Sequence, residues 1–170
     1  MIPHRVRLAI VLLGGLVVQA AIVPVFAVGG RVVDVMLLLA IAGGVLAGPD
    51  EGVVIGFLAG LGTDLLVQTP FGMWALIGCV IAYTVGVAFT GFFDGGRILR
   101  TMTIGTAMAI GTGTFVLVGR LIGQEFLADV SLVPVLLVVS IGGMALSPLA
   151  LRAMAWGLGM DRLPWAPTPR

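Results

Sequence analysis

Residues 52–72 read GVVIGFLAGLGTDLLVQTPFG, an apolar run in which Gly52, Gly56 and Gly60 recur every four residues. The next position at this spacing is Asp64. Four residues advance an α-helix by about 400°, so the four positions share one slowly drifting helix face. Glycines on one face let a second backbone come close, which is how many helices pack in lipid. The stretch therefore predicts a membrane helix whose packing face ends at an acid.

The composition of the whole chain points to lipid as its solvent. Of its 170 residues, 59% are hydrophobic and 10% are charged, whereas a soluble domain has about 25% charged residues. The mean hydropathy is +1.20. Apolar runs near the roughly 20 residues that cross a bilayer as a helix recur along the chain, and they lack the alternation of a β-barrel. We therefore expect one all-α, polytopic membrane domain.

Glycine, proline and charged residues divide the chain into six candidate transmembrane helices of a compact bundle. The expected spans lie at 8–28, 33–48, 52–68, 73–92, 98–121 and 131–151. The transmembrane domain would then cover residues 1–155, and residues 156–170 would form a proline-rich cytoplasmic tail. The first span is longer than the apolar core of a signal peptide, about 7–15 residues, so we expect a retained helix.

The distribution of arginine predicts the orientation of this bundle. With the N-terminus in the cytoplasm, seven arginines lie on the inner side and only Arg31 and Arg120 on the outer side. Cytoplasmic loops are enriched in arginine and lysine, so the count favours an N-in topology, and six spans return the C-terminus to the inside. Trp74, Trp156 and Trp165 lie near span ends, where we expect them to be interfacial anchors.

This orientation places Asp64 about three residues from the outer end of its helix, or about 5 Å of helix rise. Asp34 opens the preceding span at the same side of the membrane, with Arg31 beside it in sequence. We expect the two carboxylates to lie close together, and Asp64 to have either a charged partner or a helix-end donor. Three roles stay open for Asp64: a structural acid, an ion-handling group, or a contact with a partner protein.

The glycine face has two possible neighbours, a helix of this chain or a helix of a partner. Similar small-residue stripes occur in other expected spans, such as Gly78, Ala82 and Gly86, which favours packing within the bundle. The PDE turn at 49–51 is expected to start the third span, because acids favour a helix N-terminus. The loop with Asp94, Arg97 and Arg100 is either solvated or in contact with partners or anionic headgroups.

Residues of the common enzyme sites do not occur together in this sequence. His4 is the only histidine and precedes the first span, so no histidine-based triad or metal cluster can form. Lysine is absent, which excludes a P-loop, and the scattered arginines lack the clustering typical of nucleic-acid binding. Cys79 is expected to be a small core residue. We predict a non-enzyme without catalytic, cofactor or metal residues.

Segment 31–91 resembles MreD, a rod-shape-determining membrane protein family of bacteria. In that family an acid opens an apolar helix, which here is Asp34, and a short turn follows. The next helix has a G-F-x-x-G-x-x-x-D-L pattern, which is matched by Gly56, Phe57, Gly60, Asp64 and Leu65. The similarity continues through a P-x-G turn and an aliphatic span, matched by Pro70, Gly72, Tyr83 and Gly86. The order and spacing of these features carry the resemblance.

The resemblance implies a non-enzymatic scaffold in the bacterial cytoplasmic membrane that maintains cell shape by binding MreC. It further implies a larger elongation complex with RodA, a class B penicillin-binding protein and MreB. The family is also similar in fold to the substrate-binding subunits of energy-coupling-factor transporters, which gives a small-molecule-binding subunit as the alternative. The residues expected to be structural or to form an interface are Gly52, Gly56, Gly60, Asp64, Asp34, Arg31, Pro70 and Gly72.

Overall fold

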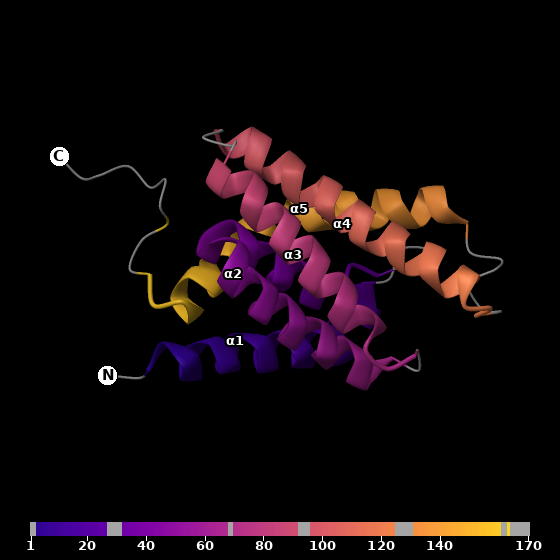
Figure 1. The fold of residues 1–170 in the computed structure, drawn as a ribbon, viewed down its shortest axis with the longest axis horizontal. Coiled ribbons are helices and arrows are strands. Elements are labelled where there is room, and N and C mark those ends of the chain that lie inside the picture. Colours follow the sequence, from indigo (N-terminus) through magenta and orange to yellow (C-terminus); the bar gives the residue numbers. More distant parts are fainter. Residues whose placement is uncertain are drawn as a thin grey trace.

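A computed structural model of the chain describes residues 3–26, 32–67, 70–91, 96–124, 131–160 and 163. All regular elements within these ranges are helical, as expected. The helices are α1 (His4–Val17), which continues into the helical turns η1 (Val18–Ile22) and η2 (Val23–Phe26), then α2 (Val35–Leu66), α3 (Met73–Gly91), α4 (Arg97–Leu121) and α5 (Leu132–Gly157). Figure 1 shows α1 along one side of the bundle and α4 and α5 along the other.

Five helical segments of the described chain are long and apolar enough to cross a membrane, which indicates a multi-pass membrane protein. Large apolar side chains lie exposed on every one of these helices, among them Leu13, Leu65, Leu76, Leu117 and Ile141, each more than 59% exposed. Soluble monomers rarely expose apolar surface on all sides, because contiguous patches promote association. Here such side chains would face lipid.

Helix α2 covers the two expected spans 33–48 and 52–68, so the described chain has five long helices where six were expected. Within α2, however, Gly48 has φ 80° and ψ −174°, which is not helical, and Pro49 follows it. This φ and ψ combination is open almost only to glycine. The chain therefore bends sharply inside α2, at the position where the sequence predicted a turn.

The two parts of α2 lie side by side as an antiparallel hairpin. A Cβ placed on Gly43 would lie 2.7 Å from the side chain of Ile55, and one on Gly62 would lie 3.1 Å from Met36 Cε. In a straight helix these residues would be about 18 Å and 39 Å apart along the axis. We call residues 35–47 the first arm and residues 49–66 the second arm.

The first arm forms the centre of the bundle. All residues from Met36 to Gly44 are buried, as expected of a helix that is apolar all round. Its neighbours come from α1, α3 and α4: Leu39 lies against Gly15, Gly44 against Ala82, and Leu37 against Gly111. The remaining helices therefore enclose one short helix, which provides the common core of the fold.

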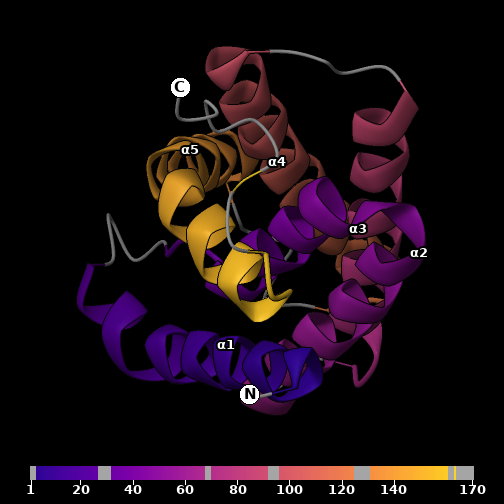
Figure 2. The same cartoon turned by 90° about the vertical axis from the view of Figure 1, so that its left-hand side faces the viewer.

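One end of the bundle collects the N-terminus of α1, the bend of α2, the N-terminus of α4 and the C-terminus of α5 (Figures 1 and 2). A cavity lined by His4, Asp50 and Gly157 joins three of these segments, and Gly86 near the end of α3 lies against Pro49. We call it the hairpin-bend end. Helix α5 reaches Gly157, two residues past the expected domain boundary, and the tail beyond residue 160 is described only at Leu163.

Candidate functional site

The glycines of the opening stretch lie against α3 of the same chain. A Cβ added at Gly56 would overlap the backbone carbonyl of Gly78, and one at Gly60 would overlap the carbonyl of Trp74. At Gly52 it would lie 3.3 Å from the carbonyl oxygen of Ala82. We call this contact between the second arm and α3 the glycine seam. Its close approach of backbones increases the packing contact that holds helices together in lipid.

The seam has one regular register along its whole length. Gly60 lies beside Trp74 and Ala75, Gly56 beside Gly78, Gly52 beside Ala82, and Pro49 beside Gly86. Each step of about four residues along the second arm is matched by a step of about four in the opposite direction along α3. The neighbour of the glycine face is therefore α3, a helix of this chain, and not a helix of a partner.

Asp64 lies at the end of the seam opposite the hairpin bend and caps α3. Its Oδ1 accepts a hydrogen bond from Trp74 N–H at 3.1 Å, and its Oδ2 accepts from Gly72 N–H and Ala75 N–H, both at 3.1 Å. The first amides of a helix have no partner within the helix. Gly72 precedes the helix and has no side chain that could serve them, so Asp64 supplies the acceptor from another helix.

The turn between the two helices aims these amides at the acid. Met73 N–H donates to the Pro70 carbonyl at 3.2 Å, and Gly72 has φ 95°. A β-turn with positive φ at its third residue requires glycine there. Leu76 N–H then donates to the Gly72 carbonyl at 2.9 Å and starts the helix. The expected site residues Pro70, Gly72 and Asp64 therefore form one unit.

Asp34 caps a different helix from Asp64. It precedes α2, is buried, and accepts a hydrogen bond from Leu37 N–H at 2.8 Å. This is the usual geometry of an aspartate N-cap. The two acids therefore cap two different helices, and their expected proximity stays a prediction. Arg31 lies outside the described residues.

Gln19 is a second cap of α2 that the sequence reasoning missed. Gln19 lies in the π-helical turn Val18–Ile22, and its side-chain Oε1 accepts a hydrogen bond from Val35 N–H at 2.7 Å. The signal was present in the sequence as an amide inside an otherwise apolar run. Because a polar side chain in lipid needs a partner, an isolated glutamine predicts such a contact.

Trp74 is not the interfacial anchor that we expected. It is only 8% exposed, and its ring stacks on Phe115 of α4 with centroids 4.2 Å apart and an interplanar angle of 17°. It therefore joins α3 to α4 next to the Asp64 cap. Trp156 is 47% exposed, and the Arg7 guanidinium lies 5.9 Å from the centroid of its ring. Trp165 lies outside the described residues.

The arrangement around Asp64 is suited to holding helices together. A carboxylate offers about four acceptor positions, and three are taken by backbone amides at the start of α3, from Gly72, Trp74 and Ala75. Thr63 donates to the Ala59 carbonyl at 3.3 Å, within its own helix. Among the described residues, no three His, Cys, Asp or Glu side chains lie close enough to hold a metal ion.

Comparisons with protein-family models, with curated proteins and with solved structures found no match for this chain.

Proposed function

We propose that the chain is an MreD-like scaffold of the bacterial cytoplasmic membrane that acts without catalysis, by binding MreC. One observation supports this most strongly. The residues that carry the resemblance in sequence lie in one structural unit: Gly56 and Gly60 form the seam, Asp64 caps α3, Pro70 and Gly72 form the turn, and Gly86 lies against the hairpin bend. The resemblance therefore follows an element that determines the fold, and the proposed function is carried over from the family that these residues resemble.

The same proposal includes six crossings with both termini in the cytoplasm. The two arms of α2 count as two crossings, although the first arm rises only about 20 Å against a hydrocarbon core of about 30 Å. Asp50 and Glu51, just after the bend, are exposed. Exposed acids favour a position of the bend at a membrane surface. Five described arginines lie toward the hairpin-bend end, namely Arg5, Arg7, Arg97, Arg100 and Arg152, which supports the cytoplasm on that side.

The partner helix must contact a surface other than the glycine seam, because α3 occupies the seam. We place the transmembrane helix of MreC in the apolar groove between α1 and α5. This groove of about 340 Å³ includes Gly14, Gly15, Ala150 and Ala153, and a Cβ on Gly14 would have no atom within 4 Å. Small residues beside open space allow a second helix to approach closely.

The alternative, a small-molecule-binding subunit of a transporter, requires a cavity with convergent polar groups at the outer end. The described cavity with mixed charges, about 560 Å³ in volume, is lined by His4, Arg5, Asp50 and Glu51 at the hairpin-bend end. In the proposed topology that end faces the cytoplasm. Thr63, one of the polar residues near the outer end, donates its hydroxyl hydrogen to its own helix.

Co-purification from membranes tests the proposal. Affinity-tagged chain is co-expressed with MreC of the same organism, extracted in mild detergent and purified, and the bound MreC is quantified. We expect a stable complex with the wild type, and loss of MreC with Gly14→Leu although this variant stays folded. A control change outside this groove, Ile110→Ala, should retain MreC, because Ile110 is exposed on α4 and does not line the groove. Absence of MreC from the wild-type sample would overturn the assignment, and equal binding by Gly14→Leu would overturn the placement of the interface.

A further inference from the structure

The cavity of about 560 Å³ at the hairpin-bend end is a groove between α1 and the second arm, with the end of α5 beside it. In both walls the first turn of the helix is charged and the next two turns are apolar. The residues that show this pattern are Arg5, Leu8 and Leu12 on α1, and Asp50, Val54 and Leu58 on the second arm. We call it the α1–α2 groove.

The α1–α2 groove has about the depth of one membrane leaflet. Its lining runs from position 4 to 12 on α1 and from 50 to 58 on the second arm, which is about 12 Å of helix rise on each wall. Half of a hydrocarbon core is about 15 Å thick. One helical turn further the walls meet, because a Cβ on Gly62 would lie 3.3 Å from Leu16 Cδ1. The groove therefore matches an acyl chain of one leaflet, whereas a transmembrane helix of a partner would continue across the whole membrane.

The two walls carry opposite charge at the mouth of the groove. Arg5 lies in the first turn of α1, which contains no acid and has no side-chain cap, and the N-terminus of a helix itself carries positive partial charge. Asp50 and Glu51 begin the facing wall, and both are exposed. Among the described residues, these side chains form no ion pair with one another. A ligand with a negative and a positive group side by side would therefore complement both walls at once.

We propose that the α1–α2 groove binds a phospholipid whose headgroup carries a primary ammonium, such as phosphatidylethanolamine. Its phosphate would lie at Arg5 and the first turn of α1, because guanidinium groups and helix N-termini bind phosphate oxygens. Its ammonium, which has three N–H donors like that of lysine, would lie at Asp50 and Glu51. One acyl chain would follow the apolar part of the groove. The site is separate from the proposed MreC contact, which lies between α1 and α5.

The two acids decide which headgroup fits best. Phosphatidylglycerol carries the phosphate without a cation, so its negative charge would lie near both carboxylates with nothing to neutralise them. Phosphatidylcholine has a quaternary ammonium, which is attracted by the carboxylates but has no N–H to donate. The expected order of affinity is therefore phosphatidylethanolamine, then phosphatidylcholine, then phosphatidylglycerol.

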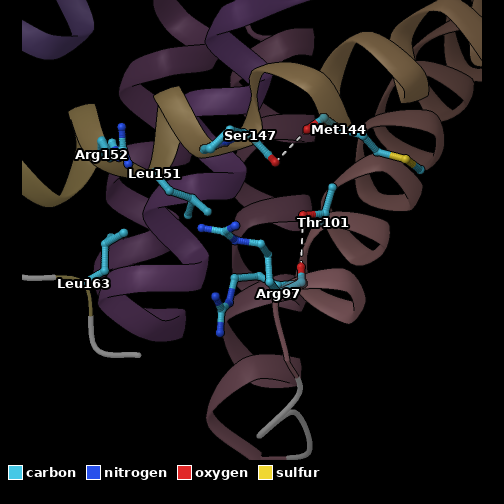
Figure 3. Close-up of a pocket in the computed structure, with 9 residues that line it drawn as sticks. Arg97, Thr101, Met144, Ser147, Leu151, Arg152 and Leu163 are labelled. Carbon is cyan, nitrogen blue, oxygen red and sulfur yellow. Dashed lines mark hydrogen bonds between the residues drawn. The ribbon is translucent and has the colours of Figure 1, made fainter. Parts of the chain in front are cut away.

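Native mass spectrometry of the full-length chain in detergent tests this site, with the three phospholipids carrying the same acyl chains. One test variant combines Asp50→Asn and Glu51→Gln, and the other is Arg5→Gln; all three side chains are exposed. The control is Arg97→Gln, which removes an exposed charge at the same end of the bundle. Arg97 borders a different cavity, between α4 and α5, where it lies beside Thr101 (Figure 3). Thermal unfolding of each variant checks that it stays folded.

We expect the wild type and Arg97→Gln to bind phosphatidylethanolamine roughly tenfold more tightly than phosphatidylglycerol, equivalent to about 1.4 kcal/mol. The double acid variant should lose this preference, and Arg5→Gln should bind all three lipids more weakly than Arg97→Gln, because all three carry the phosphate. Equal binding of the three lipids by the wild type, a preference that the double acid variant retains, or equal affinities of Arg5→Gln and Arg97→Gln would overturn the site. No MreC is present in these measurements, so their failure would leave the proposed function standing.

Discussion

Replacement of Asp64 should destabilise the bundle more than any other single change at its carboxylates. In Asp64→Ala, the amides of Gly72, Trp74 and Ala75 lose their acceptor together. Two of these three hydrogen bonds are fully buried, and lipid offers the freed amides no water as a substitute. The N-terminus of α3 would then lack any side-chain cap.

The size of the effect follows from the number of amides. A buried donor left without a partner costs about 1–3 kcal/mol, and the three losses are not strictly additive. We expect Asp64→Ala to lower the free energy of unfolding by about 3–5 kcal/mol. Asp64→Asn keeps one oxygen that can serve two of the amides but turns an NH₂ group toward the third. Its cost should be about 1–2 kcal/mol.

Asp34 provides the matched comparison, because it is also a buried N-cap aspartate. It accepts the Leu37 N–H at 2.8 Å, and Gln19 accepts the Val35 N–H at the start of the same helix. Asp34→Ala should therefore cost about 1 kcal/mol, within the usual range for an N-cap. The expected order of destabilisation is Asp64→Ala, then Asp64→Asn, with Asp34→Ala close to the latter.

Reversible unfolding in mixed micelles measures this order, with tryptophan fluorescence as the probe because Trp74 is buried beside the cap. Flux of protons into liposomes containing each variant is the second measurement. Wild-type stability of Asp64→Ala would refute the cap argument. Proton flux that Asp64→Asn abolishes, while the protein stays folded and stable, would instead assign Asp64 to ion handling.

Three further changes test the helix contacts in the same unfolding assay. Gly56→Leu should unfold the bundle or lower the free energy of unfolding by several kcal/mol, because even a Cβ at this position would overlap the α3 backbone. Gly14→Leu on the open side of α1 should stay within about 0.5 kcal/mol of the wild type. Equal stability of the two variants would contradict the seam. Gly48→Ala should cost about 1–3 kcal/mol through backbone strain alone, since the added Cβ has room 3.5 Å from Thr90, and an unchanged midpoint would show that the bend tolerates another conformation. Gln19→Leu should cost about 1–3 kcal/mol by leaving the first amide of α2 unpaired, and a neutral result would mean that this amide finds another acceptor.

The apolar runs of the sequence, and the glycine, proline and charged residues between them, predicted where helices lie but not how many there are. The turn expected at 49–51 is present as the bend at Gly48. Only this residue leaves helical geometry, so the two expected spans form the single helix α2. The sequence also could not show that the first arm would be enclosed on all sides. Its short apolar run is compatible with a buried helix and with a short lipid-facing span.

The features of the site that needed contacts between distant segments were the ones that sequence reasoning missed. Trp74 at the start of a span is typical of an interfacial anchor, and only the approach of α4 supplies Phe115 as a stacking partner. In the same way, only the fold brings Arg5 of α1 and Asp50 of α2 to one cavity. Local patterns identify which residues are unusual, whereas the packing of helices decides what those residues contact.

Asp64 and the glycines below it depend on one another for a geometric reason. The carboxylate reaches the amides of α3 only because Gly60 lets the Trp74 carbonyl and the Ala75 backbone lie directly against the second arm. A side chain at position 60 would move α3 outward and lengthen the hydrogen bonds to Asp64 at the next step of the same face. The cap in turn fixes the axial register in which Gly56 meets Gly78. The acid is therefore the last contact of the packing face, and its position four residues beyond Gly60 follows from the register of the two helices.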